Sequence, residues 1–465
     1  MSNLIGIAGI AVILAIAFTF SSNRKAVNLR IVGAAFALQV VIATIVLYWD
    51  KGRRAIEIMS EGVMAVIGYS GAGIDMVFGP LADTDVIGFS FAINVLPIII
   101  FFSALMSVLY YLRVMEWIVK LVGGFLHKVI GTGAVESMNA AANVFVGQTE
   151  APLAVRPYLK NLTEPQMFAV MVSGLASIAG TVLAGYALMG AELKYLLAAA
   201  FMAAPGGLLM AKIIMPDDHV VKAREHEKLV MEKSEHKNVI LAAASGTTDG
   251  LRLAANIGAM LIAFVALIAL FNGLVGGVLG LVGIDGPPVL IELLREAVLG
   301  QELAQAVLVP GTDKVLFEAG TVVDEAAFLS MEALSVGEVL VTAPVTLQLI
   351  LGWLFSPLMY LLSVPWAEAQ AAGALFGEKL ILNEFVAFSH LNDYLAGMSD
   401  RTVAIVTFSL CGFANLSSIA ILLGGLGVLV PEKRDLIGQL GLKAVLAGSL
   451  SNLMSAALAG LLLTF

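Results

Sequence analysis

Two glutamates stand inside long apolar stretches of the sequence, where a charged side chain is unexpected. Glu150 lies in the run Gly147-Gln148-Thr149-Glu150-Ala151-Pro152, and Glu384 lies in Asn383-Glu384-Phe385. A charge at membrane depth costs roughly 2.5–3.5 kcal/mol on insertion scales, and such residues commonly bind ions, protons or polar solutes. Both glutamates are therefore candidate functional residues.

A third polar run, Gly412-Phe413-Ala414-Asn415-Leu416-Ser417-Ser418, adds hydroxyl and amide groups beside an aromatic ring. Two carboxylates among amides and hydroxyls form a hydrogen-bonding site that disfavours anions and suits a neutral, polyhydroxylated molecule. Oxygen ligands such as those of Asn143 and Ser177 would also hold a hard cation. The residues alone predict a transporter of a neutral polar solute, coupled to a cation.

Other readings of these residues remain open. Glu150 could form a salt bridge with Arg156, whereas the nearest cation to Glu384 is Lys379. A membrane-embedded enzyme could use the two glutamates as an acid–base pair, and a channel is a further alternative. The sequence shows no metal cluster, no Ser/His/Asp arrangement, no phosphate-binding loop and no ring of pore-lining residues to support them.

Composition places these residues in a membrane protein. The 465 residues are 59% hydrophobic and only 13% charged, against roughly 25% charged residues in soluble proteins. Apolar stretches of about 20 residues, enough to cross a bilayer, recur along the chain. We expect an all-α polytopic membrane protein with about eight transmembrane helices. The apolar segments expected to supply these helices are 4–20, 28–48, 91–112, 163–190, 194–214, 238–283, 344–365, 399–430 and 436–464, of which 163–190 and 399–430 are interrupted.

Several segments differ from plain spans. Residues 51–70 and 113–128 mix charged and apolar residues at helical spacing, which predicts interfacial helices. Residues 70–90, with many glycines and Pro80, are expected to be irregular. Residues 133–160 and 368–395 are half-polar, which predicts two re-entrant hairpins.

Two charged segments separate the spans. Residues 215–237 hold five Lys/Arg, six Asp/Glu and three histidines, and we expect a cytoplasmic loop. The cations Arg24, Lys25 and Arg30 likewise predict a cytoplasmic first loop. Residues 284–343 hold ten acids and two bases. This insertion is expected outside the cytoplasm, with an amphipathic helix near 289–305 and a hairpin at 306–317. The loop histidines, His219, His226 and His236, lack metal-ligand spacing.

The sequence also contains a weak internal repeat. Each half has a half-polar segment with an acid, then a capping motif, and then a long helix interrupted by small polar residues. The interruptions are 173–180 and 411–418. Repeats with broken helices are typical of secondary transporters, because the exposed backbone groups at each break can bind substrate or ions. Packing contacts between small residues are the alternative explanation.

The three motifs together resemble those of the concentrative nucleoside transporters. This resemblance extends over nearly all of 1–283 and 345–465, and the three motifs occur in the family's order. It implies a bacterial, sodium-coupled nucleoside transporter with an inverted repeat, an elevator-like transport domain and no cofactor. In that family the two segments around 285 and 345 are usually joined by a short connection, so the intervening residues are a departure.

The resemblance also implies roles for individual residues. The nucleobase would contact Gln148, Thr149, Glu150 and Val182, whereas the ribose would contact Glu384, Phe413, Asn415 and Ser418. The implied sodium ligands are Asn143, Ser177 and the backbone carbonyl groups of Val146 and Ile178. Because these residue types are all present, sodium coupling is favoured over proton coupling.

A division of the chain follows from the same resemblance. The segments are scaffold helices (1–112), the first half of the transport domain (113–214), the cytoplasmic loop (215–237), a scaffold and trimer-interface helix (238–283), the acidic insertion (284–343) and the second half of the transport domain (344–465). The expected partners are nucleosides such as uridine, cytidine and adenosine, sodium, and two further copies in a homotrimer, with no nucleic acid. The expected location is the bacterial inner membrane.

Overall fold

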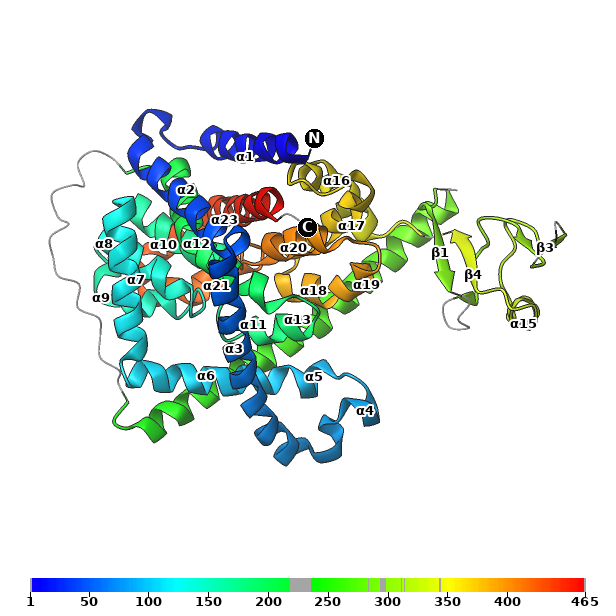
Figure 1. Ribbon diagram of the computed structural model, residues 1–465, viewed down its shortest axis with the longest axis horizontal. Coiled ribbons are helices and arrows are strands. Elements are labelled where there is room, and N and C mark those ends of the chain that lie inside the picture. Colours follow the sequence, from blue (N-terminus) through cyan, green and yellow to red (C-terminus); the bar gives the residue numbers. More distant parts are fainter. Residues whose placement is uncertain are drawn as a thin grey trace. The chain divides into compact units, whose positions relative to one another are not determined.

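The computed structural model of the protein is mostly helical (Figure 1). It describes residues 2–217, 236–282, 284–292, 298–310, 312, 314–342 and 344–463. Most of the charged loop expected at 215–237 therefore lies outside the described residues. The chain divides into two compact units, residues 1–263 with 352–465, and residues 264–351. Each unit is described by itself.

The apolar segments of the sequence form helices. In the described part of the chain, six helices are long and apolar enough to cross a membrane, or seven if one bent pair counts as a span. The N-terminal helices and the long helices of the first unit are α1 (Ser2–Thr19), α2 (Leu29–Ala43), α3 (Asp50–Phe78), α4 (Thr84–Ile87), α5 (Phe91–Asn94), α6 (Leu96–Tyr111), α7 (Val114–Ile130), α12 (Leu193–Ile214) and α23 (Arg434–Leu462). Helix α13 (Val239–Leu281) begins in this unit, and α16 (Leu347–Leu361) ends in it.

One expectation about the N-terminal region was wrong. Residues 70–78 are not irregular, because α3 continues through them to Phe78. The glycines in this stretch break no helix, since Gly71 and Gly73 lie inside α3 with helical hydrogen bonding. The helix ends at Gly79, whose φ of 55° places it outside the right-handed helical region. Irregular structure therefore begins later than the glycine content indicated.

Both predicted interruptions are present. Helix α10 (Glu164–Ala176) stops before Ser177, and α11 (Leu183–Leu188) resumes the path. In the second half α20 (Asp400–Leu410) stops before Cys411, and α21 (Ser418–Gly424) and α22 (Leu426–Leu429) follow. Both broken helices begin with a side-chain cap, from Thr163 and from Ser399.

The two half-polar segments form the expected hairpins. The first hairpin consists of α8 (Ala134–Asn143), a turn and 3₁₀-helix, and α9 (Arg156–Leu159). The second consists of α17 (Trp366–Ile381), α18 (Glu384–Ser389) and α19 (Leu391–Leu395). Helix α17 follows α16 at a bend of 117°. Each hairpin thus turns back at the acid-bearing motif.

Helices α10, α12 and α23 lie side by side in the interior of the first unit (Figure 1). Small residues permit this close approach, as is common between membrane helices. A Cβ atom on Gly448 would lie 3.0 Å from the side chains of both Leu175 and Ala414. Tight packing here holds α23 against both breaks.

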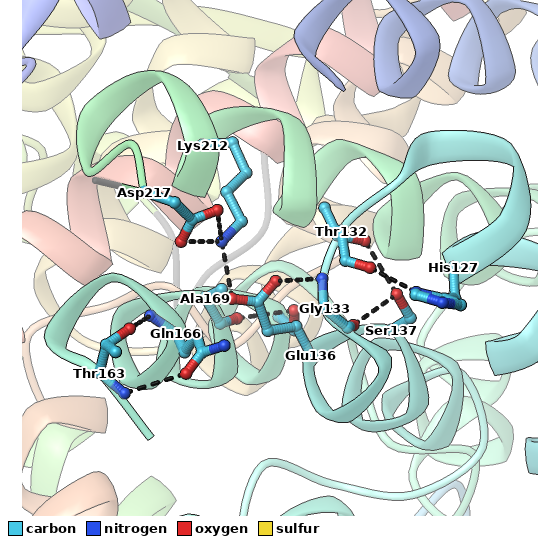
Figure 2. A network of polar contacts seen from close by, with 11 residues as sticks. His127, Thr132, Gly133, Glu136, Ser137, Thr163, Gln166, Ala169, Lys212 and Asp217 are labelled. Carbon is cyan, nitrogen blue, oxygen red and sulfur yellow. Dashed lines mark hydrogen bonds and ion pairs between the residues drawn. The ribbon is translucent and has the colours of Figure 1, made fainter. Parts of the chain in front are cut away.

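A buried ion cluster anchors the base of the first hairpin (Figure 2). The Lys212 ammonium donates to Glu136 at 2.6 Å and to Asp217 at 2.8 Å, and Glu136 also accepts from the Gly133 N–H at 3.0 Å. The side chains of Lys212 and Glu136 are only 3% and 1% exposed. The end of α12 is therefore fixed to the start of α8.

Replacing Lys212 with methionine should destabilise the protein strongly. Removing one partner of a buried pair leaves an uncompensated charge, which costs about 3–5 kcal/mol. The free energy of unfolding in detergent would measure this loss. Lys194→Met is the matched control, because Lys194 opens the same helix but forms an exposed ion pair with Glu192, worth about 0–1 kcal/mol. Equal losses in the two variants would contradict the prediction.

The second unit contains the acidic insertion. Strand β1 (Pro288–Glu292) pairs antiparallel with β4 (Glu338–Thr342), and β2 (Val307–Leu308) pairs with β3 (Val315–Phe317). Helix α15 (Glu325–Ala333) packs into a small core with Leu303 and Val341. The hairpin expected at 306–317 is confirmed. The helix expected near 289–305 is wrong at its start, because the β-branched, apolar run at 288–292 forms a strand.

Candidate functional site

Each hairpin contacts the break of its own repeat through a backbone hydrogen bond. The Gly180 N–H donates to the Phe145 carbonyl oxygen at 3.0 Å, and the Leu416 N–H donates to that of Leu380 at 3.1 Å. The two breaks are also joined to each other, since the Phe413 N–H donates to the Ser177 carbonyl oxygen at 3.2 Å. Segments far apart in sequence therefore meet at one place.

Glu384 is held by two side-chain donors. It opens α18 and is only 3% exposed. The Tyr186 hydroxyl donates to its Oε1 at 3.0 Å, and the Asn415 Nδ2 donates to its Oε2 at 3.1 Å. In the described part of the chain no ion pair with Lys379 or another cation forms at Glu384. A carboxylate accepts about four hydrogen bonds, so it keeps acceptor capacity for a ligand.

The orientation of the Asn415 amide is fixed at the start of α21. Its Oδ1 accepts from the Ser418 N–H at 2.9 Å and from the Ser417 hydroxyl at 2.7 Å. The Nδ2 atom must then face Glu384. Across the site, Gln148 Nε2 lies 3.5 Å from the Ser418 hydroxyl. The structure thus brings together Gln148, Glu384, Asn415 and Ser418 from three elements.

Tyr186 is a residue of this cluster that the sequence reasoning missed. It lies on α11, fully buried, and its ring stacks on Phe388 at 4.6 Å and contacts Phe385 at 4.7 Å between centroids. A buried tyrosine hydroxyl usually has a hydrogen-bond partner. The position of a tyrosine just after the first break was the available signal.

The other predicted base-side residues lie along the first hairpin and the first break. Val182 is buried and immediately precedes α11, and Thr149 is half-buried. Glu150 is exposed, and its carboxylate folds over Gly147, where a Cβ atom would lie 2.6 Å from Oε2. Glycine at 147 therefore leaves room for this carboxylate. In the described contacts Glu150 makes no hydrogen bond to Gln148 or Val182.

Oxygen atoms suited to a cation gather beside the first break. The Asn143 Nδ2 donates to the Asn139 carbonyl oxygen at 2.9 Å, which leaves the buried Oδ1 of Asn143 without a partner among the described residues. A buried polar atom without a partner is costly. The Ser177 hydroxyl donates to the Ser173 carbonyl oxygen at 3.1 Å and keeps its own lone pairs available. Residues Val146 and Ile178 lie outside helices beside these two.

Two further buried amide oxygens, of Asn139 and Gln148, also lack partners among the described residues. The Asn139 Nδ2 donates to the Val170 carbonyl oxygen at 3.2 Å, which leaves the Oδ1 as the unpartnered atom of this amide. The Gln148 oxygen lies at the hairpin tip, next to the base-side residues. The donor set around Asn143 fits a small hard cation, since neutral oxygens dominate it.

Asn452 on α23 supports both breaks at once and was not predicted. Its Nδ2 donates to the carbonyl oxygens of Ala176, at 2.7 Å, and Cys411, at 2.6 Å. These carbonyl groups lie where the two broken helices stop, and at membrane depth they need a donor. The Asn452 side chain therefore supplies both carbonyl groups with the donor that they would have had in an uninterrupted helix.

If Thr149 contacts the nucleobase as the resemblance implies, Gly425→Ala should weaken nucleoside binding through Thr149. A Cβ atom on Gly425 would lie 2.7 Å from Thr149 Cγ2, whereas nothing lies within 4 Å of that position on Gly424. Overpacking costs about 1–3 kcal/mol, or roughly fivefold or more in affinity. Uridine titration should show this loss in Gly425→Ala and wild-type affinity in Gly424→Ala. Identical affinities would show that Thr149 does not face the substrate.

The fold and the site define a polytopic helical transporter with interrupted helices. Three family models match this chain: Na+ dependent nucleoside transporter N-terminus at residues 8–81, Nucleoside recognition at 92–193, and Na+ dependent nucleoside transporter C-terminus at 195–313 and 321–460. The chain belongs to the concentrative, Na+-dependent nucleoside transporter family. Its members are transporters, so the acid–base enzyme reading does not apply.

Curated relatives match along the whole chain. The nucleoside permease NupC of Helicobacter pylori is 45% identical, over 99% of this chain and 98% of its own length. Sodium/nucleoside cotransporter 1 of Mus musculus is 33% identical, over 99% of this chain and 64% of its own length. This chain therefore corresponds to about two-thirds of the mouse protein and to nearly all of the bacterial one.

Solved structures of CNTnw also match. In its inward-facing, substrate-bound state CNTnw is 45% identical to this chain, with 99% of this chain and 98% of CNTnw covered and a TM-score of 0.82. A variant of CNTnw in an outward-facing state gives the same identity and coverage with a TM-score of 0.81. The chain is thus a multi-pass membrane transporter, and sodium is the family's coupling ion.

Proposed function

We propose that this protein imports nucleosides by sodium symport across the bacterial inner membrane. The observation that carries the proposal is the backbone hydrogen bond from Phe413 to Ser177. It joins a hydroxyl-binding cluster around Glu384 directly to a cluster of oxygen atoms around Asn143. A ligand at either cluster would order the same pair of breaks, which is the physical basis of coupling.

The proposed ribose site consists of Glu384, Phe413, Asn415 and Ser418. Two neighbouring ribose hydroxyls are donors, and a carboxylate accepts them in charge-assisted hydrogen bonds. Because Tyr186 and Asn415 already hold the carboxylate, it does not reorganise when the sugar binds. The half-buried Phe413 supplies an apolar surface beside these polar groups.

The proposed base site consists of Gln148, Thr149, Glu150 and Val182 on the first hairpin and first break. Its amide, hydroxyl and carboxylate groups offer donors and acceptors to a nucleobase edge, and Val182 offers an apolar contact. The free Gln148 Oε1 is one such acceptor. Uridine, cytidine and adenosine are the proposed substrates.

The proposed sodium site uses Asn143 Oδ1, the Ser177 hydroxyl and the carbonyl groups of Val146 and Ile178. A sodium ion would satisfy the buried Asn143 oxygen, whose amide is held by the Asn139 carbonyl group. Asn143 and Gln148 lie on the same hairpin, so ion binding would shape the tip that contacts the base.

We also propose an elevator movement, in which one part of each protomer moves against a fixed part. Helices α6 and α13 are suited to the fixed part, because Gly246 and Gly250 allow α13 to pack closely on Ile100 and Ser103 of α6. The Ser107 hydroxyl also donates to the Ala242 carbonyl oxygen at 2.7 Å.

The resemblance assigned residues 1–112 to the scaffold, whereas we propose that α1 and α2 belong to the moving part. The Gln39 Nε2 of α2 donates to the Ser455 hydroxyl of α23 at 3.0 Å, and the backbone of α1 packs on Leu361 at Gly9. Helix α13 is long and largely exposed along its apolar span. We propose that it forms the interface of a homotrimer.

Uptake into proteoliposomes tests the proposed coupling. Radiolabelled uridine should accumulate when a sodium gradient is imposed and should not accumulate with a pH gradient in sodium-free buffer. The alternative is a proton-coupled nucleoside symporter, which the buried carboxyl group of Glu384 favours. Full uptake driven by the pH gradient alone would establish that alternative and overturn sodium coupling.

A further inference from the structure

The second hairpin contains an acid and a histidine in contact, which the proposed transport cycle does not use. The His390 Nδ1 atom lies 3.0 Å from Oε1 and 3.1 Å from Oε2 of Glu378. The Glu378 side chain is fully buried, whereas 24% of the His390 side chain is exposed. A buried carboxylate is costly unless it is paired, and its partner here is a side chain that ordinarily gains a proton between pH 5 and 8.

This pair joins the two arms of the hairpin on either side of its tip. Glu378 lies on α17, six residues before Glu384, and His390 lies six residues after Glu384. Helix α18 therefore carries Glu384 as its first residue, and His390 caps its C-terminal end. The N-terminal end of α18 is attached to α17 through Leu382 and Asn383, and its C-terminal end is attached through the Glu378–His390 contact.

Helix α18 connects this contact to the proposed ribose site. An α-helix rises about 1.5 Å per residue, so His390 and Glu384 are roughly 9 Å apart along its axis. One face of α18 packs on the Tyr186 ring through Phe385 and Phe388. The contact with Glu378 fixes the far end of the helix. A weaker contact at His390 would let this short helix tilt, which would displace the Glu384 carboxylate.

Titratable groups of the second hairpin itself surround the pair. A second carboxylate, Asp393 on α19, is close enough to act on the charge of His390. Tyr394, on the same helix, is close enough to Glu378 and Asp393 to be affected by both. Among these side-chain types, the imidazole is the one that ordinarily changes its charge near neutral pH.

The helices that pack against the hairpin direct their charged groups elsewhere. Lys379, next to Glu378, donates to Asn452 Oδ1 of α23 at 2.9 Å. Helix α16, which packs on α17 at Gly373, carries no charged residue, and Tyr186 of α11 donates to Glu384. The charged residues of α20 are Asp400 and Arg401 at its start, next to Ser399, which donates to Glu368 at the opposite end of α17.

We propose that the Glu378–His390 pair is a proton-sensitive clasp that positions Glu384 for the ribose, so that nucleosides bind more tightly when His390 is protonated. This proposal rests on the ribose site proposed above. A carboxylate only accepts hydrogen bonds, so the Nδ1 atom carries a proton already in the neutral ring. A further proton binds at Nε2 of the partly exposed ring. The clasp then becomes an ion pair within the hairpin, where opposite charges attract more strongly than in water.

The pH dependence of uridine affinity tests the proposal. Isothermal titration of the purified protein at constant sodium, from about pH 5 to about pH 8, should show the affinity falling at least about fivefold as His390 loses its proton, the lower end of typical coupling between two sites. His390→Gln, which is neutral throughout, should lose this dependence, and so should Glu378→Gln. His390→Lys, which is charged throughout, should keep the tighter affinity at the upper end of the range.

His127→Gln is the matched control, because the His127 Nδ1 atom contacts the Thr132 carbonyl oxygen at 2.6 Å and not a carboxylate. This variant should keep the wild-type pH profile. A wild-type profile in His390→Gln would overturn the proposal, since titration of Glu384 itself would produce that result. A flat wild-type profile, or an affinity that still falls at high pH in His390→Lys, would also overturn it. Failure of the wild type to bind uridine at any pH would instead refute the proposed function.

Discussion

Glu384→Gln should reduce the affinity for uridine by at least about 30-fold, because truncating a buried, hydrogen-bonded charge at an interface costs roughly 2–5 kcal/mol. The Asn415 Nδ2 must face residue 384, since Oδ1 is occupied by Ser418 and Ser417. A glutamine would therefore turn its oxygen toward Asn415 and its NH₂ toward Tyr186. That arrangement leaves a donor where the ribose hydroxyls need an acceptor.

Isothermal titration of the purified variant with uridine would measure the loss, and size-exclusion chromatography would show whether assembly is retained. Tyr186→Phe is the comparison variant, in which a smaller loss of uridine affinity is expected than in Glu384→Gln. It removes one donor to the carboxylate but keeps the acceptor, so a smaller loss of roughly tenfold or less is expected, in line with about 0.5–1.5 kcal/mol for one hydrogen bond.

A deoxynucleoside removes the ribose hydroxyl that is proposed to bind Glu384, and so tests the same hydrogen bond from the side of the ligand. In the wild type, 3′-deoxyuridine should bind more weakly than uridine, and in Glu384→Gln the two should bind alike, since residues in contact give non-additive effects. Wild-type affinity of Glu384→Gln for uridine, or a persistent preference for the 3′-hydroxyl, would refute the ribose assignment.

The positions of the hairpins and breaks could be predicted because their signals are local. Polar residues within apolar runs, and capping residues such as Thr163 and Ser399, mark the ends of helices directly. Glu384 and Asn415 were found for the same reason, and the structure places them in contact. The roles of the site residues in binding remain predictions for the experiments above.

The supporting residues could not be predicted because their partners are distant in sequence. Tyr186 and Glu384 are 198 residues apart, and Asn452 and Ala176 are 276 apart. Asn452 lies in a segment whose sequence predicts an ordinary apolar span. Lys379 was identified from the sequence only as the nearest cation to Glu384. Only the folded structure shows that the Lys379 ammonium donates to Asn452 Oδ1 instead, at 2.9 Å.

Local propensity also misled in two places. Glycines at 71 and 73 predicted irregular structure, but these residues lie within α3. The start of the acidic insertion was expected to be helical, but β1 forms there because β4 supplies a partner strand about 50 residues later. In both cases tertiary context outweighed composition.

Asn143→Ala should abolish the sodium dependence of uridine uptake. The Asn143 amide is held by its Nδ2, so Oδ1 has a fixed direction and no protein donor among the described residues. Removing this oxygen deletes one ligand of a small set and widens the site. We expect uptake at saturating sodium to fall at least about tenfold, equivalent to about 1.4 kcal/mol, and the remaining uptake to be insensitive to sodium.

Two serines one helical turn apart, Ser177 after the last residue of α10 and Ser173 within it, provide a control for this prediction. The Ser177 hydroxyl lies at the break, whereas the Ser173 hydroxyl, one turn earlier, donates to the Ala169 carbonyl oxygen at 2.8 Å inside the helix. Ser177→Ala should raise the sodium concentration needed for half-maximal uptake, and Ser173→Ala should leave it unchanged. Asn139→Ala tests whether another unpartnered amide oxygen on α8 could act as the sodium ligand in place of Asn143 Oδ1. If Asn139→Ala removed sodium dependence while Asn143→Ala preserved it, the ion would lie one turn earlier along α8, away from the break.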